Sequence, residues 1–294
     1  MSKTSDMVRK MFGEGDAQRD AGLTTPEDVV RFDDIQYGTE EPKWQMLDVY
    51  RPKAAEGKLP VILSVHGGAW VYGDKDVYQF YCMSLARRSF AVVNYSYRLA
   101  PEYKYPASFN DTKAVCDWIL ANAEKYGFDT DNIFGVGDSA GAHMLAMFCC
   151  ALTNPAYAGT TGFEVPENFS FRGIALNCGA FLITPSQEAD MTTMLMGDYL
   201  PGGGTKEEFD LISPVKHLNA DFPPVFIMTC PGDFLNQQPS FVIPKLEELK
   251  VQFVYRRYGD AKNVLAHVFH CNIRLPQADL CNDEETAFFR SLIG

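Results

Sequence analysis

Ser139 lies in a segment whose residue types suit a nucleophile for acyl transfer. Residues 137–141, Gly-Asp-Ser-Ala-Gly, match the G-x-S-x-G pattern, in which a serine occupies a sharp turn between a strand and a helix. An apolar run at 132–136 predicts the strand, and the apolar spacing after Ser139 predicts the helix. The glycines would leave the hydroxyl uncovered, and the free N–H groups of the helix start would favour an oxyanion. A tight turn whose serine only caps the helix is the alternative.

A serine hydroxyl becomes a good nucleophile when a histidine accepts its proton and a carboxylate orients that histidine. The sequence contains five histidines. His267 and His270 follow the last expected strand, on a segment that can return over Ser139. We therefore assign the base to His267 and keep His270 as the alternative. We assign His66 to holding the shape of its loop, His143 to packing within its helix, and His217 to the surface.

The orienting carboxylate is assigned to Asp233, which follows the apolar run 225–229. A charged side chain just beyond a buried strand can face a site without entering the core. Asp260 is the competitor, but its Tyr-Gly-Asp context is typical of a surface turn. His267 and His270 lack a third ligand at suitable spacing, so we expect no metal and no cofactor.

A glycine-containing loop at 66–74 is a second segment whose residues could take part in catalysis. It follows the apolar run 59–65, and its glycines would turn backbone N–H groups inward as donors, as in an oxyanion hole. Aromatic side chains in this loop would wall a pocket for a small molecule. The candidates for such a substrate pocket are Trp70, Tyr72, Asp138 and Met194.

These residues require a scaffold of alternating strands and helices. Further strands are predicted at 33–37, 45–50, 90–97, 171–180 and 251–255. Helices are predicted at 107–125, 239–250 and 277–292, and residues 24–28 resemble a capped helix start. This order favours an α/β fold with a mostly parallel central sheet flanked by helices. No repeat or linker divides the chain, so we expect a single domain, 1–294, with a small lid from approximately 1–30 and 181–211.

Composition narrows the classes of partner. The formal net charge of -12 argues against binding to nucleic acid or to an anionic membrane surface. Eight cysteines occur without a C-x-x-C pair, and the first twenty residues contain no apolar signal region, so we expect a reduced cytoplasmic protein. We expect a small-molecule ester as partner, and the composition is compatible with a homodimer.

Taken together, four blocks resemble the α/β-hydrolase fold and, within it, the hormone-sensitive-lipase-like carboxylesterases. They comprise residues 66–70, 97–102 and 137–141, and the Asp233 and 267–269 pair. The resemblance implies Ser139 as nucleophile, His267 as base and Asp233 as the orienting acid. It also implies an oxyanion hole made by backbone N–H groups, those of Gly67, Gly68 and Ala140. The chain departs from the family at two positions that are glycine in many members, Ala69 and Val268.

The function implied is hydrolysis of small carboxylic esters through an acyl-enzyme intermediate. We expect acyl groups of about two to six carbons, because the lid is brief and pockets of this kind hold small-molecule volumes. A formamidase of the kynurenine type or a sugar deacetylase would use the same residues. A catalytically inactive binding protein of this fold is the alternative from another class, and a missing triad member would indicate it.

Overall fold

A single eight-stranded sheet organises the chain. The structure, a computed structural model, describes residues 2–185 and 190–294. The strand order is β1-β2-β4-β3-β5-β6-β7-β8. β2 pairs antiparallel with β1 and with β4, whereas all other pairs are parallel. The strands span Val29–Gln36, Met46–Pro52, Leu59–Val65, Ala91–Tyr95, Phe128–Asp138, Gly173–Asn177, Val225–Thr229 and Phe253–Arg257, numbered β1 to β8.

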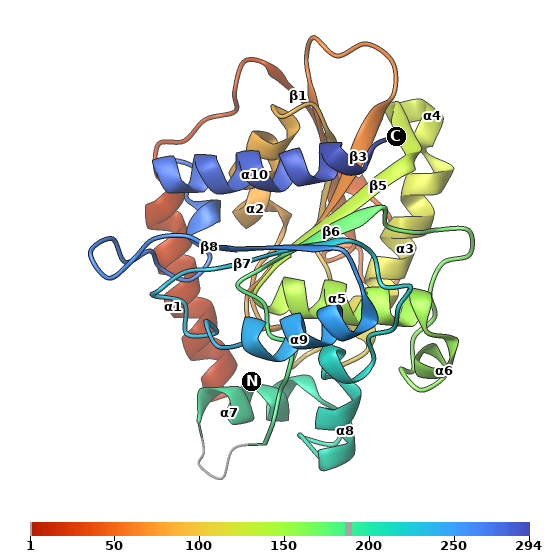
Figure 1. Cartoon of the computed structure of the whole chain (residues 1–294). Coiled ribbons are helices and arrows are strands. Elements are labelled where there is room, and N and C mark those ends of the chain that lie inside the picture. Colours follow the sequence, from red (N-terminus) through yellow and green to blue (C-terminus); the bar gives the residue numbers. More distant parts are fainter. Residues whose placement is uncertain (1, 186–189) are drawn as a thin grey trace.

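Helices cover both faces of the sheet, as predicted for parallel strands. α2 (Lys75–Ala86) and α10 (Pro276–Leu292) lie on one face, and α5 (Ala140–Thr153) and α9 (Pro239–Leu249) on the other (Figure 1). The second face also carries α3, Ala107–Ala121. Short helices connect these elements: α4 (Ala123–Tyr126), α6 (Pro155–Ala158), α8 (Lys206–Leu211), and the 3-10 turns η1 (Pro214–Lys216) and η2 (Phe269–Cys271).

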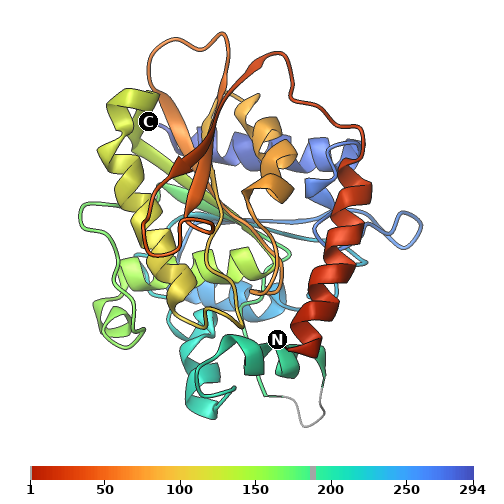
Figure 2. The ribbon, with the colours of Figure 1, turned by 180° about the vertical axis from the view of Figure 1, so that it is seen from behind.

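The N-terminal helix α1 (Lys3–Asp20) runs along one side of the molecule and reaches α7 (Met191–Tyr199) at its first turn (Figure 2). Residues near the start of the chain therefore lie beside residues from the middle of it. The two segments assigned to the lid thus contact each other, and their action as a lid stays a prediction. Residues 186–189 of the second segment lie outside the described residues. No helix in the described part of the chain is both long and apolar enough to cross a lipid bilayer.

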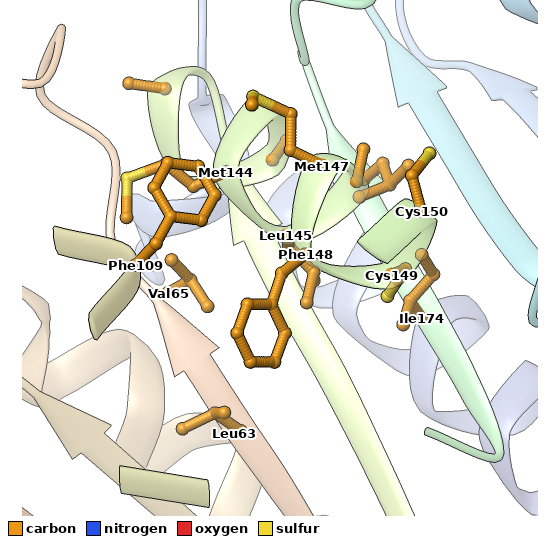
Figure 3. Packing of buried hydrophobic residues seen from close by; sticks show 14 of the residues in the cluster. Leu63, Val65, Phe109, Met144, Leu145, Met147, Phe148, Cys149, Cys150 and Ile174 are labelled. Carbon is orange, nitrogen blue, oxygen red and sulfur yellow. The ribbon is translucent and has the colours of Figure 1, made fainter. Parts of the chain in front are cut away.

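α5 is the most deeply buried helix, which explains its apolar sequence. Met144, Leu145 and Phe148 pack against Val65 of β3 and Phe109 of α3 (Figure 3). A helix that is apolar around its circumference is typical of burial on all sides. The start of α5, and therefore Ser139, is held by the core of the protein.

The strands at 59–65 and 225–229 have the predicted bounds, and the other predicted strands are found with shifted ends. The helix predicted at 107–125 is divided into α3 and α4. Two further elements differ from the prediction. No helix begins at 24–28, because the turn there leads directly into β1, whose first residue Val29 pairs with β2. α2 was not predicted, although Asp74 caps it through a 2.9 Å hydrogen bond from Val77 N.

Candidate active site

Ser139 occupies a strained turn between β5 and α5. Its φ of 52° and ψ of -117° lie outside the regions that serine ordinarily adopts. The Ser139 N–H donates to the Asn177 carbonyl at 2.9 Å, which fastens the turn to the end of β6. A Cβ on Gly141 would lie 2.0 Å from the Val65 oxygen, and one on Gly137 2.7 Å from the Gly141 backbone. The two glycines are therefore needed for close approach.

Asp233 and His267 meet at the same edge of the sheet. The Nδ1–H of His267 donates to Asp233 Oδ1 at 2.6 Å. Burial acts to raise the pKa of Asp233, but the bond and charge of His267, together with hydrogen bonds from Thr229 and the Leu235 N–H, hold that pKa below its ordinary value. Asp233 is thus an ionised acceptor that leaves the His267 Nε2 as the basic nitrogen.

A backbone contact explains how two distant segments form this pair. The Gly232 N–H donates to the Leu265 carbonyl at 2.9 Å, and Gly232 and Ala266 form an isolated parallel bridge. A Cβ at Gly232 would lie 2.5 Å from that carbonyl. Val268 follows with a positive φ of 53°, a conformation that glycine adopts without strain. The departure from the family pattern at Val268 therefore places a β-branched residue in a left-handed turn.

The elbow and the acid–histidine pair lie at the carboxyl ends of β5 and β7, separated only by β6. The charge of His267 acts on the adjacent Asp138, which lies next to Ser139 in sequence. Among the described residues, no hydrogen bond joins the Ser139 hydroxyl to His267. Catalytic hydrogen bonds are often long without substrate, so the serine–histidine contact stays a prediction.

The oxyanion loop requires a correction. The Gly67 N–H donates to the Tyr78 hydroxyl at 3.0 Å, and that hydroxyl donates to Asp138 Oδ2 at 2.8 Å. Gly67 is therefore wrong as an oxyanion donor, because its only N–H is already bonded away from the pocket. Ala69, which was not among the predicted site residues, lines the pocket with Ser139 and Ala140. Ala69 has a positive φ of 54°, a backbone conformation that is uncommon for residues other than glycine.

His66 holds this loop in place, as predicted. Its Nδ1–H donates to the Gly67 carbonyl at 2.7 Å, and its ring stacks on Tyr97 at 4.0 Å between centroids. Burial lowers the pKa of His66 to about 4, so the ring stays neutral. The loop is thus fixed by a buried neutral histidine.

A pocket of about 630 Å³ opens beside Ser139. Its lining is mostly apolar and comes from α1, the oxyanion loop, the segment after β6, α7 and the segment after Asp233. Representative lining residues are Phe12, Trp70, Leu182, Met191, Leu195 and Phe234. Trp70 is therefore correctly predicted as a wall of the pocket. The Phe234 ring also lies 4.2 Å from the His267 ring, between centroids.

Three of the four pocket candidates lie outside this lining. Tyr72 turns toward α1, where its hydroxyl donates to Asp16 at 2.9 Å. Asp138 is buried behind the elbow, where desolvation raises its pKa to about 6. Met194 is exposed and its sulfur accepts from the Thr4 hydroxyl, whereas Met191 and Leu195 of the same helix line the pocket.

The alternative acid and base occupy different environments. Asp260 is an exposed turn residue, accepting from the N–H groups of Lys262 and Asn263, as predicted. His270 is completely buried, and burial lowers its pKa to about 3. It therefore lacks access to a substrate in the pocket. His217, which was assigned to the surface, is half-buried, with its ring stacked on Tyr157 at 3.9 Å between ring centroids.

Two groups of side chains have potential metal-ligand atoms within 4.8 Å of one another among the described residues. One contains Asp138, His270 and Cys271, and the other contains Cys178 with the Asp233–His267 pair. In the second group the carboxylate and Nδ1 already satisfy each other. In the first, Asp138 accepts from Tyr78. Asp138 and Asp233 thus both have hydrogen-bond donors within the protein.

The sequence resembles a known protein family and several esterases. A model of the BD-FAE family matches residues 47–238. Versiconal hemiacetal acetate esterase of Dothistroma septosporum is 26% identical over 224 residues, 71% of this chain and 67% of that protein. Probable carboxylic ester hydrolase LipM of Mycobacterium tuberculosis is 29% identical over 74% of this chain. That match spans 52% of LipM, so the chain corresponds to about half of this relative's length.

Solved structures match over almost the whole chain. An inhibited esterase B from Lactobacillus rhamnosis has a TM-score of 0.87 at 26% identity, covering 99% of this chain and 97% of that one. An esterase from Pyrobaculum calidifontis has a TM-score of 0.77 at 23% identity, covering 99% and 94%. The sheet and the helices on both of its faces are thus those of the α/β-hydrolase fold. Because the family model matches well over half of its residues, the chain belongs to the BD-FAE family and is an α/β-hydrolase of the carboxylesterase type.

Proposed function

We propose that the protein hydrolyses small carboxylic esters with short acyl groups, through an acyl-enzyme formed on Ser139. One observation carries this proposal. A serine in a strained turn at the start of α5 opens onto an apolar pocket, at the sheet edge that also holds the Asp233–His267 pair. A capping serine would not need the left-handed turn, because a normal cap adopts extended geometry.

The proposed reaction follows the positions of the hydrogen-bonding groups. His267 Nε2 takes the proton from the Ser139 hydroxyl as its oxygen attacks the carbonyl carbon of the ester. His267 then gives this proton to the departing alkoxide, and the acyl group stays on Ser139. Water, activated by the same nitrogen, releases the carboxylic acid. Asp233 keeps the imidazole in the required tautomer and stabilises its charged form.

The oxyanion formed in both steps would be bound by the backbone N–H groups of Gly68, Ala69 and Ala140. Ala69 and Ala140 line the pocket, and Ala140 is the first residue of α5, where N–H groups have no partner within the helix. The positive end of the α5 dipole adds to the stabilisation. Donors arranged in advance are typically the largest single contribution to such a reaction.

The substrate class is proposed from the pocket. Its volume of about 630 Å³ is in the range of small-molecule sites, and its lining is mainly apolar. The related esterase B was crystallised with a tributyrin phosphonate, which supports acyl groups of a few carbons here. The eight cysteines are free, as suits the reducing cytoplasm proposed from their spacing.

A panel of substrates tests the proposal. We expect turnover of nitrophenyl esters to be highest for acyl groups of about two to six carbons and to fall for palmitate. A steady rise toward palmitate, with a jump when micelles form, would identify a lipase instead. N-formylkynurenine and acetylated sugars belong in the same panel, and preference for either would redirect the proposal to a formamidase or a deacetylase. Absence of turnover and of fluorophosphonate labelling would indicate a binding protein.

A further inference from the structure

Trp70 forms a wall of the pocket and follows the proposed oxyanion donor Ala69. Both residues have positive φ angles, 54° for Ala69 and 62° for Trp70. Left-handed geometry costs free energy in any residue with a Cβ, so contacts elsewhere must hold the backbone here. The Gly68 carbonyl accepts from the N–H groups of Val71 and Tyr72 at 3.1 and 2.9 Å, and the Trp70 carbonyl accepts from the Ala100 N–H at 3.0 Å. The indole of Trp70 adds side-chain contacts to these main-chain bonds.

His143 provides the hydrogen bond that fixes this indole. The Trp70 Nε1–H donates to His143 Nδ1 at 3.1 Å, and the rings meet edge to face at 5.2 Å between centroids. The other ring nitrogen, Nε2, lies 2.7 Å from the Ile212 carbonyl. Because an indole can only donate and a carbonyl can only accept, the tautomer must carry its proton on Nε2. Burial lowers the pKa of His143 to about 4, which keeps this ring neutral.

The same histidine connects three parts of the site. It lies one helical turn after the nucleophile, and its N–H donates to the Ser139 carbonyl at 3.1 Å. Ile212 immediately follows α8 and the predicted lid segment 181–211, which together with α1 we call the cover. The end of α7 also contacts Trp70, because Tyr199, the last residue of that helix, stacks on the indole at 5.3 Å between centroids. Trp70 is thus held between the elbow helix and the cover.

We propose that His143 is a positioning residue, which locks the Trp70 indole and thereby fixes both the oxyanion loop and the acyl-binding wall against the cover. This inference rests on the proposed esterase function. His143 contacts no substrate atom in this arrangement, and it acts only through Trp70. Its two ring nitrogens are both used, so each side of the link can be removed separately.

The expected consequence is a loss in turnover rather than in ground-state binding alone. Without the Nδ1 acceptor, the indole loses its partner and the left-handed turn at Ala69 can relax. A displaced Ala69 N–H would stabilise the oxyanion less, and one such donor is typically worth about 100-fold or more when it is removed completely. We expect about a tenfold fall in kcat for a displaced donor, and a broader preference for acyl length because the wall is no longer fixed.

The experiment uses the full chain with four variants. His143→Leu removes both hydrogen bonds, and His143→Asn retains an acceptor near Nδ1. Trp70→Phe keeps an aromatic ring but removes the indole N–H. Because His143 and Trp70 act as a unit, the double variant His143→Leu/Trp70→Phe should lose about as much kcat as either single variant, not the product of the two losses. His143→Asn should recover part of the lost kcat.

His217→Leu is the matched control. His217 is also a packed histidine near the cover, stacked on Tyr157 and donating to the Asp210 carbonyl, but it does not contact Trp70. We expect it to lower the melting temperature without changing kcat or acyl preference. Kinetics are measured well below each melting temperature, so that unfolding does not contribute.

The outcomes separate the two levels of inference. The positioning role is wrong if His143→Leu, while folded, keeps wild-type kcat and acyl preference, or if the single losses multiply in the double variant. In both cases a wild type that is labelled by a fluorophosphonate and hydrolyses the esters leaves the proposed function intact. A wild type that is neither labelled nor active overturns the proposed function, and the positioning role with it.

Discussion

The base of the site and its cover are built by different kinds of contact. The base is fixed by main-chain groups. The Ser139 N–H donates to the Asn177 carbonyl at the elbow, and the Gly232 N–H donates to the Leu265 carbonyl beside the Asp233–His267 pair. In the cover, α1 is attached by side chains that reach across to other segments, of which Arg9 is the main example. Main-chain contacts follow from local sequence and strand order, whereas side-chain contacts depend on which surfaces meet. We therefore expect the base to determine the rate of the chemical step and the cover to determine the affinity for the substrate.

Replacing the nucleophile provides the strongest test of the base. Ser139→Ala should fold normally and lose turnover on the order of a millionfold, because only Ser139 combines the elbow with the start of α5. Fluorophosphonate labelling should disappear with it. Ser240→Ala, an exposed serine on α9, should retain labelling and activity. Labelling that persists in Ser139→Ala would assign the nucleophile elsewhere.

The orienting acid is tested by a pair of matched variants. Asp233→Asn should lower kcat by up to about ten-thousandfold, because an amide would favour the wrong tautomer of His267. Asp260→Asn should have little effect, since Asp260 only closes an exposed turn. Steady-state kinetics on a short ester measure both. The opposite ranking of the two variants would show that the assignment of the acid is wrong.

Much of the base could be predicted because its signals are local. Apolar runs of strand length specify β3 and β7, and the glycine spacing around Ser139 specifies the elbow. The Asp233–His267 contact was predictable from the rule that reactive loops follow the carboxyl ends of parallel strands. These features require no knowledge of which distant side chains meet.

The errors occur where a distant side chain decides the outcome. Gly67 was a reasonable donor by sequence, but Tyr78 of α2, a helix that was not predicted, takes its N–H. Tyr72 was placed in the pocket, whereas Asp16 of α1 draws its hydroxyl away. Met194 and Met191 lie within one helical turn of each other and are both exposed, and only the packing of α7 decides that Met191 lines the pocket. No local pattern encodes these contacts.

A buried acid of α10, Glu285, is expected to affect the stability of the protein and not its catalytic step. Glu285 of α10 accepts from Asn177 Nδ2 at 2.6 Å and from the Tyr81 hydroxyl at 3.3 Å. Burial raises the pKa of Glu285 to about 7, from an ordinary value of 4.5. The folded protein thus binds this proton more tightly than the unfolded chain, so stability is full below pH 4.5 and falls as the pH rises to about 7.

Glu285→Gln should remove this dependence, because the amide stays neutral. Its oxygen can accept from Asn177 Nδ2, and its NH2 group can donate to the Tyr81 hydroxyl oxygen. Relative to wild type, the variant should gain on the order of 2 kcal/mol in free energy of unfolding between pH 5 and pH 8. Urea denaturation at the two pH values measures it. Parallel pH profiles for variant and wild type would mean that Glu285 titrates near its ordinary value. In that case Glu285 would not make the stability of the protein depend on pH.

Arg9 is the corresponding test of the cover, and its expected effect is the smallest. Its guanidinium donates to the Val71 carbonyl at 2.8 Å and the Ala100 carbonyl at 2.9 Å, and it also pairs with Glu102. The Glu102 pair is partly exposed and contributes little, so most of the stabilisation comes from the two carbonyl bonds. Arg9→Ala should therefore lower the free energy of unfolding by about 1–2 kcal/mol.

The kinetic consequence of Arg9→Ala separates the cover from the base. α1 supplies Met11 and Phe12 to the pocket, so a loosened helix should raise KM severalfold and leave kcat within about twofold. Lys10→Ala is the matched control on the same helix, because Lys10 only approaches Glu14, at 4.0 Å in solvent. It should change neither parameter. If Arg9→Ala instead lowered kcat at constant KM, the cover would take part in the transition state, and the division between a chemical base and a binding cover would not hold.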